Sequence, residues 1–104
     1  MRRVVRLDPE AEAELQEAAS CYAARSKAAS RRFLKQVLAL ARVIGDAPDR
    51  FPRLVDPRTE RPVHRALVPG FPYALVFLAA DDRVHILAVA HTRRDPGYWI
   101  HRIG

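Results

Sequence analysis

The sequence lacks several features that would place a protein in a particular class. Its 104 residues include a single cysteine, Cys21, which excludes an intramolecular disulfide and a CxxC metal or redox motif. No apolar run approaches the roughly 18–20 residues of a membrane span, and the N-terminal stretch MRRVVRLDPE has no signal-peptide core. We therefore expect a cytoplasmic protein without membrane association, built as one domain over residues 1–104.

Lysine is also scarce in a chain that is otherwise basic. Of the 18 Lys and Arg residues, two are lysine and the other sixteen are arginine, and the formal net charge is +6. The planar guanidinium group of arginine pairs well with carboxylates and phosphates, so this composition favours an anionic partner. Residues 25–45 carry six cations and no acid. Three of those cations, Arg31, Lys35 and Arg42, form either a solvated helix face or a docking surface for an acidic protein.

Two helices are predicted in the first half of the chain. The first covers residues 9–24, with Asp8 as its N-cap and three glutamates near its positive end. We interpret those glutamates as a solvated face, because no histidine lies near them to complete a metal site. The second helix begins after the N-cap Ser26 and continues to about residue 44, where Gly45 is expected to end it.

Three β-rich runs in the second half predict an antiparallel meander. They cover residues 63–68, 73–78 and 84–90, and short breaker-containing or polar joints separate them. The run at residues 73–78 is apolar on both faces, which predicts a central strand. Strict alternation in the last run places Val84, Ile86, Ala88 and Ala90 on one face.

The order of these elements indicates an α+β fold. A short β-type run at residues 3–7 precedes the two helices, and a proline-containing loop at residues 46–60 separates them from the meander. The two helices form an αα-hairpin whose apolar side can pack on one face of the sheet. The order of the strands within the sheet is left open by the sequence.

Several motifs in this order resemble the RelE/ParE superfamily of bacterial type II toxins. The resemblance runs from about residue 4 to residue 102 and depends on joint order and spacing more than on any one motif. The residues that carry it are Glu14-Leu15, Glu17-Ala18-Ala19, Tyr22, Ile44, Pro48, Phe51-Pro52, Phe71-Pro72-Tyr73, Val76-Phe77, Ile86 to His91, Arg94-Asp95-Pro96 and Trp99.

The resemblance implies a small toxin that a cognate antitoxin protein wraps and neutralises. From the acid-free block at residues 25–45, we predict that acidic residues of the antitoxin meet Arg31, Lys35 or Arg42. Operator DNA would be bound only through the complex with the antitoxin. The superfamily has two branches, one that cleaves messenger RNA in the ribosomal A site and one, the ParE-like branch, that poisons DNA gyrase. No cofactor is expected in either case.

A ribonuclease of this kind needs a base for the ribose 2′-OH, cations for the developing phosphorane charge and an acid for the leaving oxygen. The candidates are Arg61, His64, Arg65, His91, Arg93 and Tyr98. His64 and His91 are the plausible acid and base pair, although each also has an ordinary structural role. The lysine cluster that ribonuclease members commonly place before the second strand is missing. Catalysis is therefore the alternative interpretation.

The ending of the chain favours the gyrase branch. Residues 91–102 read HTRRDPGYWIHR, a pattern similar to the ParE-like ending, and a turn is expected at Asp95 to Gly97. Arg93, Arg94, Tyr98 and Trp99 are the candidate target-binding residues, while the two aromatic residues could instead pack over the sheet or stack on bases. Three hypotheses remain: a gyrase-inhibiting toxin, a ribosome-dependent mRNA endonuclease, and a non-toxic basic domain that acts as a co-repressor.

Overall fold

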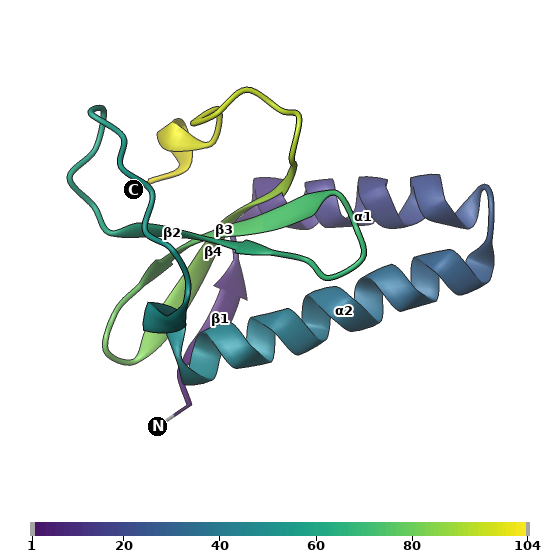
Figure 1. Ribbon diagram of the computed structural model, residues 1–104, viewed down its shortest axis with the longest axis horizontal. Helices are drawn as coiled ribbons and strands as arrows, with labels where there is room; N and C mark the ends of the chain where they lie inside the picture. Colours follow the sequence, from purple (N-terminus) through teal and green to yellow (C-terminus); the bar gives the residue numbers. More distant parts are fainter. Residues whose placement is uncertain (1, 104) are drawn as a thin grey trace.

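The computed structural model describes residues 2–103 and confirms the α+β class (Figure 1). None of its helices is long and apolar enough to cross a membrane. The elements are β1 Val4–Leu7, α1 Pro9–Ala23, α2 Lys27–Asp46, η1 Pro48–Arg50, β2 Val63–Leu67, β3 Tyr73–Ala79, β4 Arg83–His91 and η2 Ile100–Arg102, where η denotes a 3₁₀-helix.

The four strands form one mixed sheet in the order β1-β4-β3-β2. Strands β2, β3 and β4 make the predicted antiparallel meander. Strand β3 is internal, and its five middle residues are all buried, which confirms the prediction of a central strand. Strand β1 joins β4 in parallel, with Val4 opposite Arg83 and Leu7 opposite Ile86. This pairing brings the N-terminus against the last strand and makes β4 internal as well.

Both helices begin at the predicted caps. The Asp8 carboxylate accepts a hydrogen bond from the Glu10 N–H at 3.0 Å, and the Ser26 hydroxyl oxygen accepts one from the Ala29 N–H at 3.2 Å. Each bond satisfies a backbone donor that has no partner inside its helix.

Gly45 does not end the second helix, because α2 continues through it to Asp46. A Cβ atom on Gly45 would lie 3.1 Å from Cγ2 of Val5 and 3.3 Å from the carbonyl oxygen of Arg3. The Arg3 N–H also donates to the Gly45 carbonyl at 3.1 Å. The glycine therefore serves the close approach of α2 to β1 rather than a left-handed helix cap.

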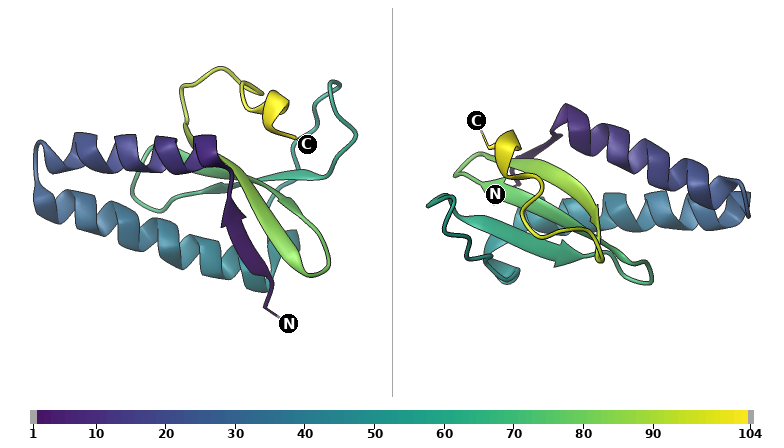
Figure 2. Two further views of the ribbon diagram at one scale, coloured as in Figure 1. Left: turned by 180° about the vertical axis from the view of Figure 1, so that it is seen from behind. Right: turned by 90° about the horizontal axis from the view of Figure 1, so that it is seen from above.

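The two faces of the sheet are covered by different parts of the chain. The helical hairpin packs on one face, as predicted, through buried residues such as Phe33 and Ile44 against Leu75 and Phe77. The end of the chain packs on the other face, where Trp99 joins a second cluster. Figures 1 and 2 show α2 and the C-terminal end on opposite sides of the strands.

Strand β4 does not keep the strict alternation that its sequence predicts. Val76 of β3 pairs with Ala88 while Phe77 pairs with Ile86, so Leu87 is an extra residue in β4. After this bulge the faces exchange: Val84, Ile86 and Val89 pack with the helices, and Ala88 and Ala90 pack with the C-terminal end. A bulge leaves its residue out of the regular ladder and redirects the groups around it.

Candidate functional site

The C-terminal segment, residues 92–103, holds the residues that the sequence marks for target binding. It leaves β4 through a turn in which the Arg94 N–H donates to the His91 carbonyl at 2.9 Å. Gly97 has a φ of 79°, and a Cβ atom there would overlap the guanidinium group of Arg58. The predicted turn at residues 95–97 is therefore present, and Gly97 is required both by its backbone angle and by the space around it.

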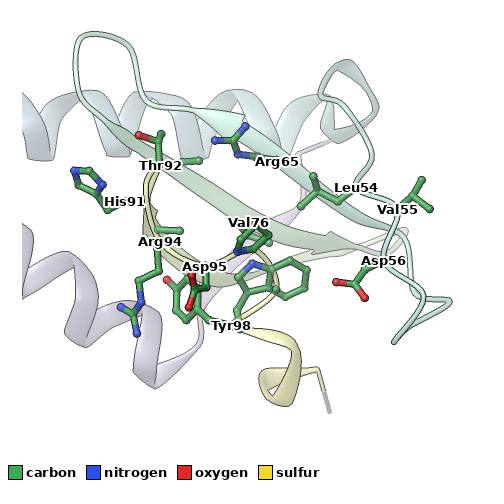
Figure 3. Close-up of a pocket in the computed structure, with 15 residues that line it drawn as sticks. Leu54, Val55, Asp56, Arg65, Val76, His91, Thr92, Arg94, Asp95 and Tyr98 are labelled. Carbon is green, nitrogen blue, oxygen red and sulfur yellow. The ribbon is translucent and has the colours of Figure 1, made fainter.

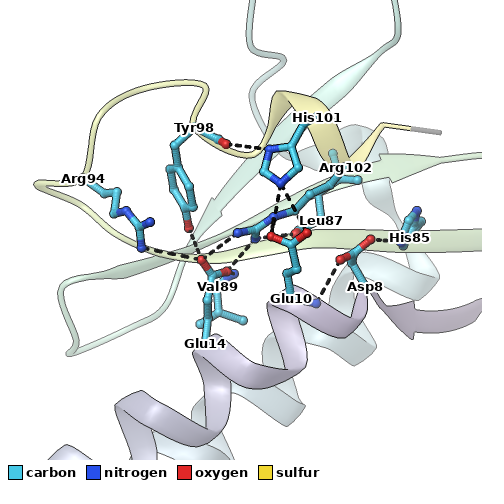
Figure 4. Close-up of polar contacts among 10 residues, drawn as sticks. All are labelled: Asp8, Glu10, Glu14, His85, Leu87, Val89, Arg94, Tyr98, His101 and Arg102. Carbon is cyan, nitrogen blue, oxygen red and sulfur yellow. Dashed lines mark hydrogen bonds and ion pairs between the residues drawn. The ribbon is translucent and has the colours of Figure 1, made fainter.

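One carboxylate, that of Glu14 in α1, binds the C-terminal segment to the rest of the fold (Figure 4). Its Oε2 atom accepts a hydrogen bond from the Tyr98 hydroxyl at 2.7 Å. The guanidinium group of Arg102 binds both of its oxygens, at 2.8 and 3.2 Å. The side chains of Arg102 and Glu14 are only 5% and 14% exposed, so this forked ion pair is largely shielded from water.

Glu14 and Arg102 also bind backbone groups on the part of the β4 edge that β1 does not cover. Strand β1 pairs with β4 only as far as Ile86, which leaves the next outward-facing groups of β4 without a strand partner. The Val89 N–H donates to Oε1 of Glu14 at 3.1 Å, and Nη1 of Arg102 donates to the Leu87 carbonyl at 3.0 Å. The carboxylate and the guanidinium group thus act where a neighbouring strand would otherwise be needed.

Further contacts surround this pair. The guanidinium carbon of Arg94 lies 4.0 Å from the centre of the Tyr98 ring, and that of Arg102 lies 5.1 Å from it. Arg94 also approaches Oε2 of Glu14 at 3.8 Å. Glu10, one turn earlier in α1, accepts from Nε of Arg102 at 3.1 Å and lies 3.1 Å from Nε2 of His101. Two arginines and one histidine of the segment therefore meet two glutamates of one helix.

This setting shifts two ionisation equilibria. Burial raises the pKa of Tyr98, and the hydrogen bond to Glu14 raises it further, because both favour the neutral phenol. Burial alone would lower the pKa of Arg102, but the hydrogen bond and charge of Glu14 outweigh it and raise that pKa. Both groups keep their neutral-pH forms throughout the physiological range.

A cavity of about 320 Å³ lies between the C-terminal segment, the loop near residue 55 and the sheet (Figure 3). Small apolar side chains, including Ala74, Val76 and Ala90, lie on its sheet side. Arg65 and Arg94 also line it, together with Asp56, whose carboxylate is held by Arg58 at 2.7 Å. This pairing lowers the pKa of Asp56 to about 2.

The structure does not bring the two candidate catalytic histidines together. The His64 ring stacks on Phe77 at 5.3 Å between centroids, and its Nδ1 lies 2.9 Å from the carbonyl oxygen of Phe51. The Nδ1 atom of His91 accepts from the Arg93 N–H at 3.1 Å. His64 pairs with Phe77 of β3 while His91 pairs with Tyr73, four residues away, a separation of about 13 Å along the strand.

The other ribonuclease candidates are also dispersed. Arg65 and Tyr98 line the cavity, whereas Arg61 and Arg93 are exposed outside it. Residues 2–103 contain no cluster of three or more His, Cys, Asp or Glu residues that could hold a metal ion.

The candidate target-binding residues differ in exposure. Arg93 and Arg94 are exposed, while Tyr98 is partly buried and bonded to Glu14. Trp99 is 4% exposed and belongs to the second core cluster. Its indole therefore packs over the sheet, the alternative that the sequence left open, and offers almost no surface to a partner.

The predicted antitoxin-binding cations form one stripe on α2. Arg31, Lys35 and Arg42 are exposed, and Leu38, which is 65% exposed, lies among them. The spacing of residues 31, 35, 38 and 42 places all four on the same side of a helix. Within residues 2–103, none of the three cations makes an ion pair.

Sequence reasoning missed the two residues that organise this region. Glu14 was interpreted as part of a solvated face, and Arg102 was not singled out. A signal was present for Glu14, since it lies three residues after Ala11 and four before Ala18, both buried on the apolar stripe of α1. Nothing local indicates Arg102, whose partners lie far away in the sequence.

Comparison with protein families decides the classification. Residues 5–96 match the family described as the ParE toxin of type II toxin–antitoxin systems, parDE. The chain belongs to the ParE toxin family. A search of curated proteins gives no match. Membership confirms the superfamily and branch that the motifs indicated, and it implies that this ParE-family toxin has an antitoxin partner.

The matched region of the ParE-family toxin ends at Pro96, before the residues that close the C-terminal segment onto α1. Tyr98 and Arg102 therefore lie outside the part of the chain on which the assignment depends. Their contacts with Glu14 are features of this chain's own structure.

The raised pKa of Tyr98 predicts how stability changes with pH. The hydroxyl contribution is fully present below the usual tyrosine pKa of 10.0 and is lost as pH rises above it, because the unfolded chain releases this proton first. Urea unfolding from pH 7 to 11.5 should therefore show a falling free energy of unfolding above pH 10, with a smaller fall for Tyr98→Phe. At pH 7 this variant should lose about 1.5–3 kcal/mol, the usual value of a hydrogen bond to a charged group.

Tyr22→Phe is the control, since Tyr22 packs in the helix-side cluster and is not bonded to Glu14. Equal alkaline slopes for wild type and Tyr98→Phe would contradict the assignment.

Proposed function

We propose that this toxin acts without catalysis by binding DNA gyrase through the exposed cations of its C-terminal segment, and that an antitoxin neutralises it. The observation that carries the proposal is the exposed pair Arg93 and Arg94 on a segment fixed to the fold by Glu14. A cationic surface with a defined conformation loses little freedom when it binds an acidic partner. Tyr98, partly exposed beneath Arg94, would contribute the edge of its ring.

The arrangement of the histidines argues against general acid–base chemistry. A catalytic pair must reach one phosphate from two sides within hydrogen-bond distance. His64 stacks on the helix-side core residue Phe77, whereas Arg65, its neighbour in β2, lines the cavity on the opposite face. The mRNA endonuclease is kept as the second candidate because Arg65, His91 and Arg94 all line one cavity.

The proposed antitoxin surface is the stripe on α2. Exposed Leu38 lies between Lys35 and Arg42, so a partner segment that alternates apolar and acidic side chains fits it. Such a partner would cover the leucine while its carboxylates meet the cations. Operator DNA would then be bound by the complex through the antitoxin.

Reversing two charges of this stripe should weaken antitoxin association. Lys35→Glu combined with Arg42→Glu is expected to slow association by about tenfold or more and to reduce its dependence on salt, because electrostatic steering acts mainly on the association rate. Surface plasmon resonance at several salt concentrations measures both effects. The control is Arg32→Glu with Arg50→Glu, which changes the net charge equally on other exposed positions. Unchanged antitoxin kinetics in the stripe variant would remove this surface from the proposal.

Two further double variants separate gyrase binding from catalysis. His64→Ala with His91→Ala should keep most of the inhibition of plasmid supercoiling by purified gyrase, because no proton transfer is lost. Arg93→Glu with Arg94→Glu should abolish that inhibition, because it reverses the charge of the proposed contact surface. Arg50→Glu with Arg53→Glu is the charge-matched control, because both arginines are exposed, one at the end of η1 and one in the loop that follows it. Circular dichroism confirms that each variant is folded.

The same proteins are added to translating ribosomes to test the alternatives. Loss of two acid–base groups from a nuclease would cost on the order of 10²–10⁴-fold in rate per group. Cleavage of message at A-site codons, with supercoiling unaffected and the double-histidine variant inactive, would replace gyrase by the ribosome as the target. Inactivity in both assays, with intact operator binding alongside the antitoxin, would favour the co-repressor.

A further inference from the structure

We infer that Glu14 is a positioning residue for target binding: it does not contact the target but holds the C-terminal segment in the conformation that the target recognises. The inference rests on the proposed function, because the exposed cations it positions are those assigned to the target. It assigns a role to a side chain in the middle of α1, far in sequence from the contact surface.

The contacts of Glu14 join α1 to β4 and to the C-terminal segment. Its two oxygens receive the Tyr98 hydroxyl, two nitrogens of Arg102 and the Val89 N–H, all within 3.2 Å. Arg94 lies 3.8 Å away. Residues 94, 98 and 102 are spaced by four, and all three turn toward the same carboxylate (Figure 4).

The remaining contacts of the segment would leave its conformation less defined. Trp99 anchors its middle in the second core cluster, whereas Ile100 and Ile103 after it are only partly buried against that cluster. Arg93, Arg94, Asp95 and Pro96 are all exposed. The orientation of Arg94 therefore depends on the Tyr98 ring beneath it and, through the Tyr98 hydroxyl, on Glu14.

Loss of the Glu14 charge would leave several polar groups without a proper partner. Arg102 would be a nearly buried cation whose closest remaining carboxylate is the more exposed Glu10. Burying an unpaired charge is strongly unfavourable, so the segment should move until Arg102 reaches water. The core between the helices and the sheet should stay packed when the segment moves, because Arg102 is not part of it.

A positioning role has a distinct quantitative signature. If only a fraction of molecules hold the competent conformation, the apparent dissociation constant rises by the inverse of that fraction, whereas the saturated complex is unchanged. Glu14→Gln, which keeps the side-chain shape and one acceptor oxygen, should therefore raise the half-inhibitory concentration for supercoiling by about tenfold or more while reaching the same maximal inhibition. Its antitoxin affinity should stay the same, because the α2 stripe is a separate surface.

Amide hydrogen exchange gives a second readout. In Glu14→Gln, exchange should be faster at Val89 and within residues 92–103, with β2 and β3 unchanged. Glu12→Gln is the matched control, since Glu12 is exposed on the same helix and loses the same charge. If Glu14→Gln fails to fold, Tyr98→Phe removes a single bond to the carboxylate and should shift inhibition and exchange in the same direction by a smaller factor.

Three results overturn the inference. In the first, Glu14→Gln matches Glu12→Gln in both inhibition and exchange. In the second, it loses antitoxin affinity and maximal inhibition together, with faster exchange throughout the sheet, which shows a general structural role. If the wild-type protein has no effect on gyrase, only the proposed function is overturned.

In that case the role of Glu14 is decided by amide hydrogen exchange in residues 92–103 and by growth arrest when the protein is expressed in cells. The third overturning result is that Glu14→Gln equals Glu12→Gln in both of these measurements.

Discussion

The forked ion pair between Glu14 and Arg102 is the interaction on which the arrangement of the C-terminal segment and of the adjacent edge of β4 depends. It joins the middle of α1 to the last turn of the chain, and both side chains also bind backbone groups of β4. The Leu87 bulge and the early end of β1 leave those backbone groups without a strand partner. A charged pair normally costs much of its attraction in lost hydration, but here it also satisfies two backbone groups of an internal strand. The pair therefore fixes the strand edge and the C-terminal segment together.

The two faces of the sheet are covered by the two parts of the chain that carry the proposed binding surfaces. The helical hairpin supplies most of the core on one face and exposes the stripe of Arg31, Lys35, Leu38 and Arg42, the surface proposed for the antitoxin. The other face is covered by a short segment that packs one tryptophan and keeps Arg93 and Arg94 exposed. Because these surfaces lie on different elements, neutralisation by an antitoxin and action on a target can use separate residues of one small domain. Substitutions are therefore expected to affect one proposed function without the other.

The sequence predicted the fold closely because its signals are local. Capping residues such as Asp8 and Ser26, and the apolar runs of the meander, specify elements within a few residues. Three features that depend on distant contacts were not predicted correctly or at all. Gly45 lies within α2 because β1 packs against it, the alternation of β4 is shifted at Leu87, and Glu14 is bonded to residues 84 and 88 positions away. In each case the residue type was read by its usual local role, whereas a long-range contact determines its actual one. The position of Trp99 likewise depends on long-range contacts, because it is buried against a sheet face that only the folded chain creates.

The account depends on strong coupling between α1 and the end of the chain, and a double-mutant cycle measures that coupling directly. The free energy of unfolding is determined for the wild type, Glu14→Gln, Arg102→Met and the double variant by urea denaturation at one pH and salt concentration. Groups that bind one another in a shielded site show interaction energies of up to about 3 kcal/mol. We expect about 1–3 kcal/mol here, with the double variant more stable than the sum of the single effects implies. Effects that add to within about 0.5 kcal/mol would show that the pair does not hold the segment and would contradict the account.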